Sequence, residues 1–158
     1  MIRLATAAGV VELADGDRGI TRQGEGVWDV AGNWLVLDRD VVVTADGDEV
    51  RWPELRPTCV ATVGSGSAVV GTSGAHLFRV RARGQVEAVE SFDAVPTRDE
   101  WYTPWGAPAD VRSIAVTPSG IALVNVHVGG IWWGHVDGAT WEPVVPVDAD
   151  VHEVVEAG

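Results

Sequence analysis

The stretch Asp110-Val111-Arg112-Ser113-Ile114-Ala115 has a counterpart near the end of the chain, Asp150-Val151-His152-Glu153-Val154-Val155. About forty residues separate the two copies, which is the length of one four-stranded blade of a β-propeller. The opening residues, Ile2-Arg3-Leu4-Ala5-Thr6, instead match the second strand of such a unit. We therefore expect a repeat that begins on a second strand and ends on a first strand.

The unit that begins at Val111 predicts four strands joined by glycine-containing turns. Three earlier units align with it, and no long stretch has a helical period of apolar residues. The expected fold class is all-β: a single domain over 1–158, a β-propeller with four blades of four antiparallel strands per chain. In the last unit the expected strands are 111–117, 121–128, 131–136 and 140–145. In the third unit they are an inner strand that includes Ala61, followed by 68–72, 76–81 and 86–91. The second unit has 26–31, 34–38, 41–45 and 50–55, and the first has 2–6, 10–13 and 19–22.

The first unit lacks an inner strand, and residues 151–155 are expected to supply it, so that the C-terminal strand closes the ring. Two arrangements satisfy this requirement. One chain could close as a four-bladed monomer, or two chains could exchange end strands and form an eight-bladed ring around a two-fold axis. Both remain open at this point, and in the second the chain is its own partner in a homodimer.

The composition excludes several classes of function. The chain has no lysine, since all 11 of its basic residues are arginines. A lysine Schiff base and a phosphate loop built around lysine are therefore ruled out. The net charge of −12 argues against a nucleic-acid partner, because no basic stripe is present to replace counterions on a phosphate backbone.

Cellular location is indicated by three further features. The single cysteine, Cys59, permits no intramolecular disulfide and lies in an apolar stretch, where a buried thiol is expected. No apolar run reaches the roughly 18 residues that a membrane span needs. The opening residues do not have the pattern of a secretory signal. Together these features predict a cytoplasmic protein with no membrane partner.

Several motifs in the last third of the chain carry a family resemblance. They are Arg112-Ser113-Ile114-Ala115-Val116, Val124-Asn125-Val126-His127-Val128-Gly129-Gly130-Ile131 and Asp137-Gly138-Ala139-Thr140-Trp141. These motifs resemble those of bacterial proteins with BNR or Asp-box repeats, the sialidase-like and YVTN-like propellers. The resemblance implies a propeller fold, and the chain resembles one half of such a protein.

The Asp-box itself is degenerate. The box reads Ser-x-Asp-x-Gly-x-Thr-Trp, and the matching window here is 134–141, in which Gly134 and Val136 replace the serine and the aspartate. An Asp-box is a folding element, so it gives no argument for catalysis. The resemblance also implies the sialidase set of three arginines, a tyrosine nucleophile with a glutamate partner, and an aspartate acid/base. Tyr102 is the only tyrosine and Arg112 is the only arginine expected on the channel, so we expect no sialidase activity.

The candidate ligand-binding residues gather on the face of the propeller that carries the loops between blades. The connection 93–110 is the longest loop and contributes three aromatic residues. The two copies of the opening motif each place a basic residue at the top of an inner strand, directly after an aspartate. A histidine ends a second strand on the same face. The candidates are Trp101, Tyr102, Trp105, Asp110, Arg112, His127, Asp150 and His152.

Two interpretations of this group remain open. In the functional one, aromatic faces stack on a sugar ring or another flat ligand, Arg112 holds a carboxylate, and a histidine or carboxylate transfers protons. In the structural one, the tryptophans pack the loop onto the blades, and Arg112 pairs with Asp110 or Asp150. No short-spaced pair of metal ligands is present, so we expect no metal and no cofactor.

The remaining tryptophans are expected to be structural. Trp132 and Trp133 are adjacent in one strand and should therefore point to opposite faces, one packed and one exposed. Four others recur at positions that suit packing between blades: Trp28, Trp34, Trp52 and Trp141.

The sequence therefore favours a non-enzymatic propeller that serves as a scaffold or binding module and associates with itself. The repeat is well defined, whereas no nucleophile motif or catalytic set accompanies it. The alternative is a carbohydrate-binding or glycoside-hydrolase-like domain with a pocket on the loop face, in which Asp110 and Asp150 are the two carboxylates.

Overall fold

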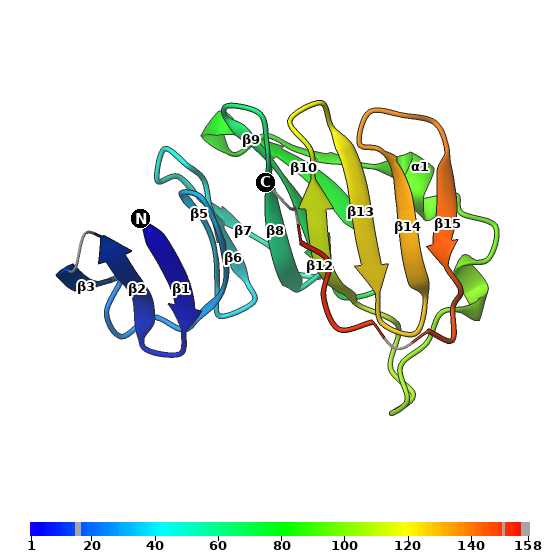
Figure 1. Cartoon of the computed structure of the whole chain (residues 1–158), viewed down its shortest axis with the longest axis horizontal. Coiled ribbons are helices and arrows are strands. Elements are labelled where there is room, and N and C mark those ends of the chain that lie inside the picture. The colour runs from blue at the N-terminus through cyan, green and yellow to red at the C-terminus, as the bar shows by residue number, and fades with distance from the viewer. Residues whose placement is uncertain (15–16, 150, 156–158) are drawn as a thin grey trace.

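In the computed structural model, which describes residues 1–14, 17–149 and 151–155, the chain forms four antiparallel sheets that follow one another along an arc (Figure 1). Consecutive strands pair within each sheet, because short turns join them. The sheets contain β1 (Ile2–Thr6), β2 (Gly9–Ala14) and β3 (Asp17–Thr21); β4 (Val27–Ala31), β5 (Trp34–Leu37), β6 (Val41–Val43) and β7 (Glu49–Arg51); β8 (Pro57–Val63), β9 (Ser67–Thr72), β10 (Leu77–Arg81) and β11 (Val86–Ala88); and β12 (Val111–Val116), β13 (Ile121–Val126), β14 (Gly130–His135) and β15 (Trp141–Val145).

This architecture confirms the all-β propeller and the division into four units. The innermost strands of the last three sheets are β4, β8 and β12, and they pack one on the next. The three-stranded first sheet packs through β1 on β4. No helix among the described residues is long and apolar enough to cross a membrane.

The outer strand of the third unit is shorter than the sequence predicts. It ends at Ala88, and the short helix α1 (Glu90–Asp93) follows it. Val89, Phe92 and Val95 are all buried, and their three-residue spacing turns the chain inward as a helical turn rather than outward as a strand. Two 3-10 turns, η1 (Ala82–Gly84) and η2 (Arg98–Glu100), complete the helical elements of the described chain.

A hydrophobic core fills each space between neighbouring sheets. The first sheet contributes Val10 to a cluster with Leu35 and Leu37 of the second. Trp34 and Trp52 lie between the second and third sheets. The largest cluster lies between the third and fourth sheets and includes Phe92, Trp101, Trp132 and Trp141.

The tryptophan predictions are mostly confirmed. Trp34, Trp52 and Trp141 are buried, while the adjacent pair divides into a buried Trp132 and an exposed Trp133. The prediction for Trp28 was wrong, because its ring is 55% exposed. The cause is a β-bulge at this residue, which is described below with the candidate site.

The turn that resembles an Asp-box is a folding element, as expected. The backbone N–H of Gly138 donates to the carbonyl of His135 across 2.7 Å and closes the hairpin. The indole of Trp141 lies so close to Gly134 that a Cβ there would approach it to 2.7 Å. Gly134, which replaces the serine of the motif, is therefore required by the packing of Trp141.

Within this single chain, the prediction that residues 151–155 complete the first sheet was wrong. The segment forms no strand, and the first sheet has only β1, β2 and β3. Instead the segment lies against the last sheet, where the N–H of Val154 donates to Ser113 Oγ at 2.9 Å. In Figure 1 strands of the second and third sheets lie between β1 and β12, so the segment contacts β12 without pairing with β1.

Candidate functional site

The three inner strands share one irregularity, a β-bulge at the second residue. The pairing register shifts between Val27 and Asp29 in β4, between Pro57 and Cys59 in β8, and between Val111 and Ser113 in β12. An extra residue in one strand escapes the regular pairing, so a bulge re-aims its side chain. The bulged residues are Trp28, Thr58 and Arg112, and His152 has the corresponding position in the repeat.

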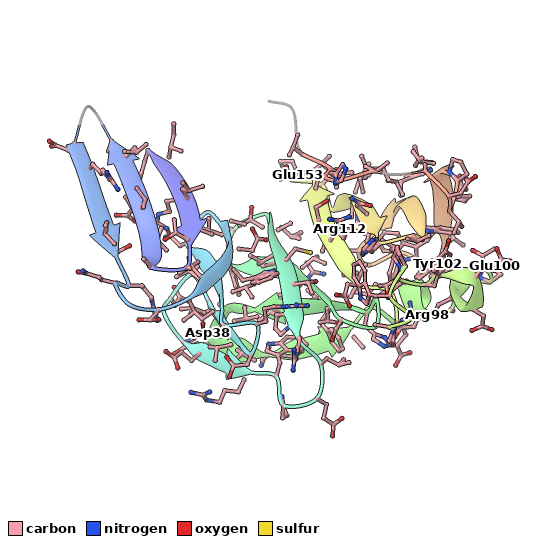
Figure 2. All side chains as sticks on the ribbon, turned by 90° about the horizontal axis from the view of Figure 1, so that it is seen from below. Asp38, Arg98, Glu100, Tyr102, Arg112 and Glu153 are labelled. Carbon is pink, nitrogen blue, oxygen red and sulfur yellow. The ribbon has the colours of Figure 1, made fainter. Side chains whose placement is uncertain are left out.

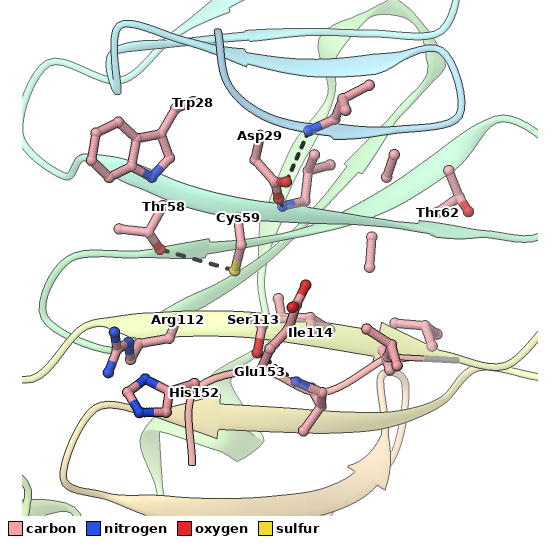
Figure 3. Close-up of a pocket in the computed structure, with 18 residues that line it drawn as sticks. Trp28, Asp29, Thr58, Cys59, Thr62, Arg112, Ser113, Ile114, His152 and Glu153 are labelled. Carbon is pink, nitrogen blue, oxygen red and sulfur yellow. Dashed lines mark hydrogen bonds between the residues drawn. The ribbon is translucent and has the colours of Figure 1, made fainter. Parts of the chain in front are cut away.

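These strands and the segment 152–155 line a cavity of about 480 Å3. Figure 3 shows Arg112 beside His152 on one wall and Trp28 beyond Thr58 on the other. Arg112 and His152 are both exposed. Among the described residues the guanidinium of Arg112 forms no ion pair within 4.0 Å. The structure therefore places Arg112 and His152, which the sequence assigned to equivalent positions of two blades, beside each other in the lining of this cavity.

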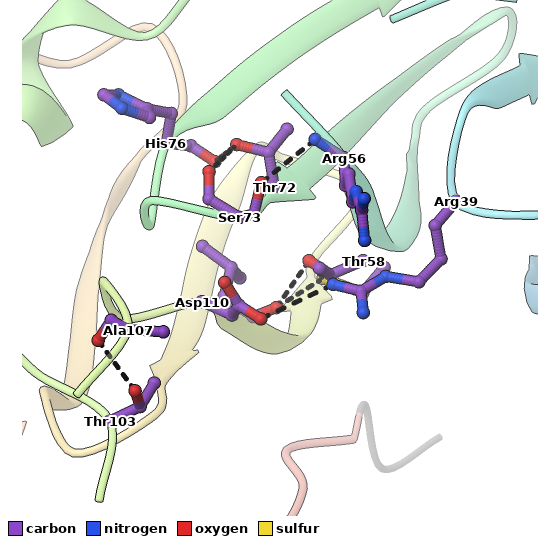
Figure 4. A network of polar contacts seen from close by, with 11 residues as sticks. Arg39, Arg56, Thr58, Thr72, Ser73, His76, Thr103, Ala107 and Asp110 are labelled. Atoms are coloured by element: carbon purple, nitrogen blue, oxygen red, sulfur yellow. Dashed lines mark hydrogen bonds and ion pairs between the residues drawn. The ribbon is translucent and has the colours of Figure 1, made fainter. Parts of the chain in front are cut away.

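A second arginine joins the second blade to the fourth at the same end of the cavity. The guanidinium of Arg39 lies 4.7 Å from the ring centroid of Trp28 and 3.4 Å from Asp110 Oδ2 (Figure 4). Its backbone has a φ of 60° in the turn between β5 and β6. This left-handed conformation is costly for a residue with a Cβ, and here it places the guanidinium between an aromatic face and a carboxylate.

Asp110 is held in this network by its backbone as well. It forms a β-bridge with Ser73, and its carbonyl accepts the N–H of His127 at 2.9 Å. Arg56 is adjacent, since its backbone N–H donates to Ser73 Oγ at 3.0 Å (Figure 4). The Asp110 carboxylate thus pairs with Arg39 rather than with Arg112, the partner considered from the sequence.

The long loop forms a separate aromatic group. Trp105 is 68% exposed and meets the ring of His127 edge to face, with centroids 4.8 Å apart. Tyr102 is 54% exposed, and Figure 2 shows it apart from Arg112, on the side of Glu100. The loop is fixed by Thr103, whose hydroxyl donates to the carbonyl of Ala107 at 2.7 Å.

Trp101 does not belong to this exposed group. It is only 8% exposed, with its ring between those of Phe92 and Trp132 at centroid distances of 5.5 and 5.6 Å. A ring buried in this way has no free face for a ligand. Asp150, the other predicted carboxylate, lies outside the described residues.

The interior of the cavity is acidic. Asp29 accepts the N–H groups of Val30 and Val60 at 2.9 and 2.8 Å (Figure 3). Burial raises the pKa of Asp29 above its usual value of 3.8, and the nearby charge of Glu153 raises it further, although the two N–H groups oppose this shift. Burial also raises the pKa of the Cys59 thiol, so this thiol is poorly suited to act as a nucleophile.

Sequence reasoning missed Trp28, Arg39, Thr58 and Asp29. Three of them had a usable signal, since Trp28 and Thr58 align with Arg112, and Asp29 aligns with Ser113, once the inner strands are superimposed on the repeat. Arg39 had none, because its place depends on an unusual turn. Within the described part of the chain, no cluster of three or more histidine, cysteine or acidic side chains could hold a metal ion.

Comparisons with known proteins support the fold and no more. No family model matches the chain, and no curated protein matches it. A solved propeller structure described as "YCF48 bound to D1 peptide" is similar, with a TM-score of 0.52 and 17% sequence identity. The similarity covers 89% of this chain and 49% of that one, so the chain spans about half the length of its structural neighbour. This confirms the propeller fold, while membership of the BNR or Asp-box proteins is not shown.

Proposed function

We propose that the chain is a non-enzymatic binding module and that the cavity opening binds an anionic peptide segment. The observation that carries the proposal is the repeated bulge, which directs Trp28 and Arg112 toward one opening. Bulges beside binding sites re-aim side chains in this way. Arg112 supplies a guanidinium for a carboxylate, and Trp28 supplies an aromatic face.

A peptide is the preferred ligand class for two reasons. The structural neighbour is described as bound to a peptide, which favours this class for a shared fold. In addition, the net charge of the protein is −12, so an acidic segment needs arginines at its binding site to offset that charge. Arg112 lines the cavity, and the guanidinium of Arg39 lies over the ring of Trp28, which also lines it. Arg56 lies near Arg39 (Figure 4).

The test is a titration followed by tryptophan fluorescence, with ten-residue peptides that carry three glutamates or three glutamines. We expect binding of the acidic peptide only, weakened by salt because exposed charges are screened. Arg112→Gln should reduce the affinity at least tenfold, whereas Arg18→Gln, on the exposed strand β3, should leave it unchanged. Equal binding of both peptides, or an unchanged Arg112→Gln, would contradict the proposal.

A second candidate is a carbohydrate-binding domain, favoured by the exposed rings of Trp105 and Tyr102. Aromatic faces of this kind stack on sugar rings. Glycan-array binding that disappears in Trp105→Ala but persists in Arg112→Gln would support this candidate over the peptide. A glycoside-hydrolase function has weaker support, because Arg39 already engages Asp110. A panel of fluorogenic glycosides tests it.

Self-association is the remaining part of the proposal. The first sheet has no inner strand, and one of its faces carries exposed apolar side chains. An unpaired strand edge and an uncovered apolar face both favour association. A homodimer would provide a partner for both the unpaired edge and the apolar face.

A further inference from the structure

The first sheet is incomplete in two respects. One edge of β1 pairs with β2, and no strand among the described residues pairs with the other edge. Ala5 and Val10 face the second sheet, whereas the opposite face is uncovered. That uncovered face carries the exposed side chains of Ile2, Leu4, Leu13 and Ile20.

The segment 151–155 already occupies the position of an inner strand. Between the second and third sheets, Asp29 Oδ2 accepts the N–H of Val60 at 2.8 Å. Between the fourth sheet and the segment, Ser113 Oγ accepts the N–H of Val154 at 2.9 Å. Asp29 and Ser113 are both the third residue of their inner strands, and Val60 and Val154 correspond in the repeat. The same contact between blades therefore recurs at the segment.

A second contact recurs at its acceptor. The carbonyl of Val111 accepts a hydrogen bond from the hydroxyl of Thr58 in the preceding sheet, at 2.6 Å. The carbonyl of Val151, its counterpart in the repeat, accepts one from Asn125 Nδ2 in the preceding sheet, at 3.0 Å. The accepting carbonyl is thus equivalent in the two places, whereas the donor lies on the inner strand β8 in one and on the second strand β13 in the other.

The segment and β1 do not meet in one chain. No described strand pairs with the second edge of β1, and the arc separates the first sheet from the last (Figures 1 and 2). We propose that residues 151–155 of one chain form the inner strand of the first sheet of a second copy. This inference rests on the self-association part of the proposed function and gives that association its residues.

Two copies complete each other by a two-fold exchange, because each donates one segment and accepts one. The exposed face of the first sheet then packs on the outer face of the partner's last sheet, where Leu123 and Trp133 are cross-strand neighbours. Corresponding faces are already buried between sheets within the chain. The ring closes with no free end, which limits the assembly to a dimer.

The repeat also gives the register of the exchanged strand. Thr6 and Val126 end their strands, so Leu4 corresponds to Val124, which pairs with Ile114. Val154 corresponds to Ile114 and is therefore expected opposite Leu4. Opposite Cα atoms in antiparallel strands lie about 4.5–5.5 Å apart, which is within the range of about 4.4–6.8 Å for a disulfide.

The experiment combines a mass measurement with a cross-link. Light scattering of the full chain without ligand should give twice the chain mass of 16.7 kDa. The variant with Leu4→Cys and Val154→Cys should form a covalent dimer on a non-reducing gel. The matched control, Ile20→Cys with Val154→Cys, should not, because Ile20 lies on the outer strand of the same sheet.

Three results would overturn the exchange. A monomer with an internal disulfide between positions 4 and 154 would show closure within one chain. A monomer without that disulfide would show that the segment is not the inner strand of β1. A dimer in which the control pair cross-links as well as the test pair would show another mode of association. Each result is obtained without peptide, so a failed peptide titration is a separate outcome.

Discussion

The first and last sheets are built from the same repeat, yet their side chains have very different surroundings. The last sheet has four strands, and a large aromatic core covers one face while the segment 151–155 crosses the other. The first sheet has three strands, and every residue of β3 is exposed. Sequence pattern alone therefore does not determine the stability of a blade, since a blade depends on its inner strand and on both neighbours.

The contrast also separates two roles of the repeat. Where neighbours are present, the repeat forms cores and the bulged positions line a cavity. Where a neighbour is absent, the same alternation of side chains leaves an apolar face in water. Exposed apolar faces of this kind often mark interaction sites, and we propose that a second copy of the chain covers this one.

The largest expected effect comes from the loss of a core side chain, compared with the loss of a side chain on the uncovered face of the first sheet. Phe92 is fully buried against Trp101 and Trp141, so Phe92→Ala should lower the free energy of unfolding by about 3–5 kcal/mol. Leu4 is 59% exposed in the single chain. Leu4→Ala should therefore cost within about 0.5 kcal/mol for a monomer, and clearly more for an exchanged dimer. Urea unfolding at two protein concentrations measures both.

The next effect concerns the two equivalent contacts between inner strands. Asp29→Ala leaves the N–H of the buried Val60 without its acceptor, which should cost about 1–3 kcal/mol. Ser113→Ala releases the N–H of Val154 and a long contact of 3.5 Å from Asn125 Nδ2, which keeps the carbonyl of Val151 as an acceptor. It should therefore leave the unfolding free energy of the four sheets nearly unchanged. Similar losses in both variants would mean that the segment contributes to stability as β8 does.

The protonation of Asp29 gives a pH dependence with a definite sign. Burial raises the pKa of Asp29 in the folded protein above 3.8, so its contribution to stability is fully present below pH 3.8. That contribution is lost as the pH rises through the higher folded pKa. Asp29→Asn removes this dependence. The difference in unfolding free energy between wild type and variant should shift against the wild type as the pH rises, and a shift in the opposite direction would contradict the assignment.

The smallest expected effect comes from backbone strain in the turn between β13 and β14. Val128 has a φ of 44°, a conformation in which a β-branched residue is strained by about 1–2 kcal/mol. Glycine relieves this strain but loses more backbone entropy on folding. We expect Val128→Gly to raise the unfolding free energy by about 0.5 kcal/mol. A decrease would show that packing of the half-buried valine side chain outweighs the strain.

Most of the fold could be predicted from the sequence, because turns and strands are local. The glycine at 138 and the alternation along β13 and β14 placed the last sheet correctly. The helix at Glu90–Asp93 was missed because Phe92 packs against Trp101 and against Trp141, and Trp141 belongs to the next sheet.

The candidate site was predictable only where the repeat itself marked it. Arg112 and His152 were found because their motifs match. Trp28 was misassigned, since a bulge changes the direction of a side chain without changing the apolar pattern of its strand. Trp101 was placed among the ligand candidates because the sequence shows that the loop contains aromatic residues. It does not show which of their rings is buried in the core.

The central claim is that residues 151–155 supply the missing inner strand of the first sheet. Amide hydrogen exchange tests it most directly, because β1 and β3 are the two edges of one sheet and β3 remains an edge in every arrangement. The account predicts strong protection for the amides of β1 that face its free edge, and fast exchange for those on the outer edge of β3. Equally fast exchange at both edges would show that no strand covers β1 and would contradict the account.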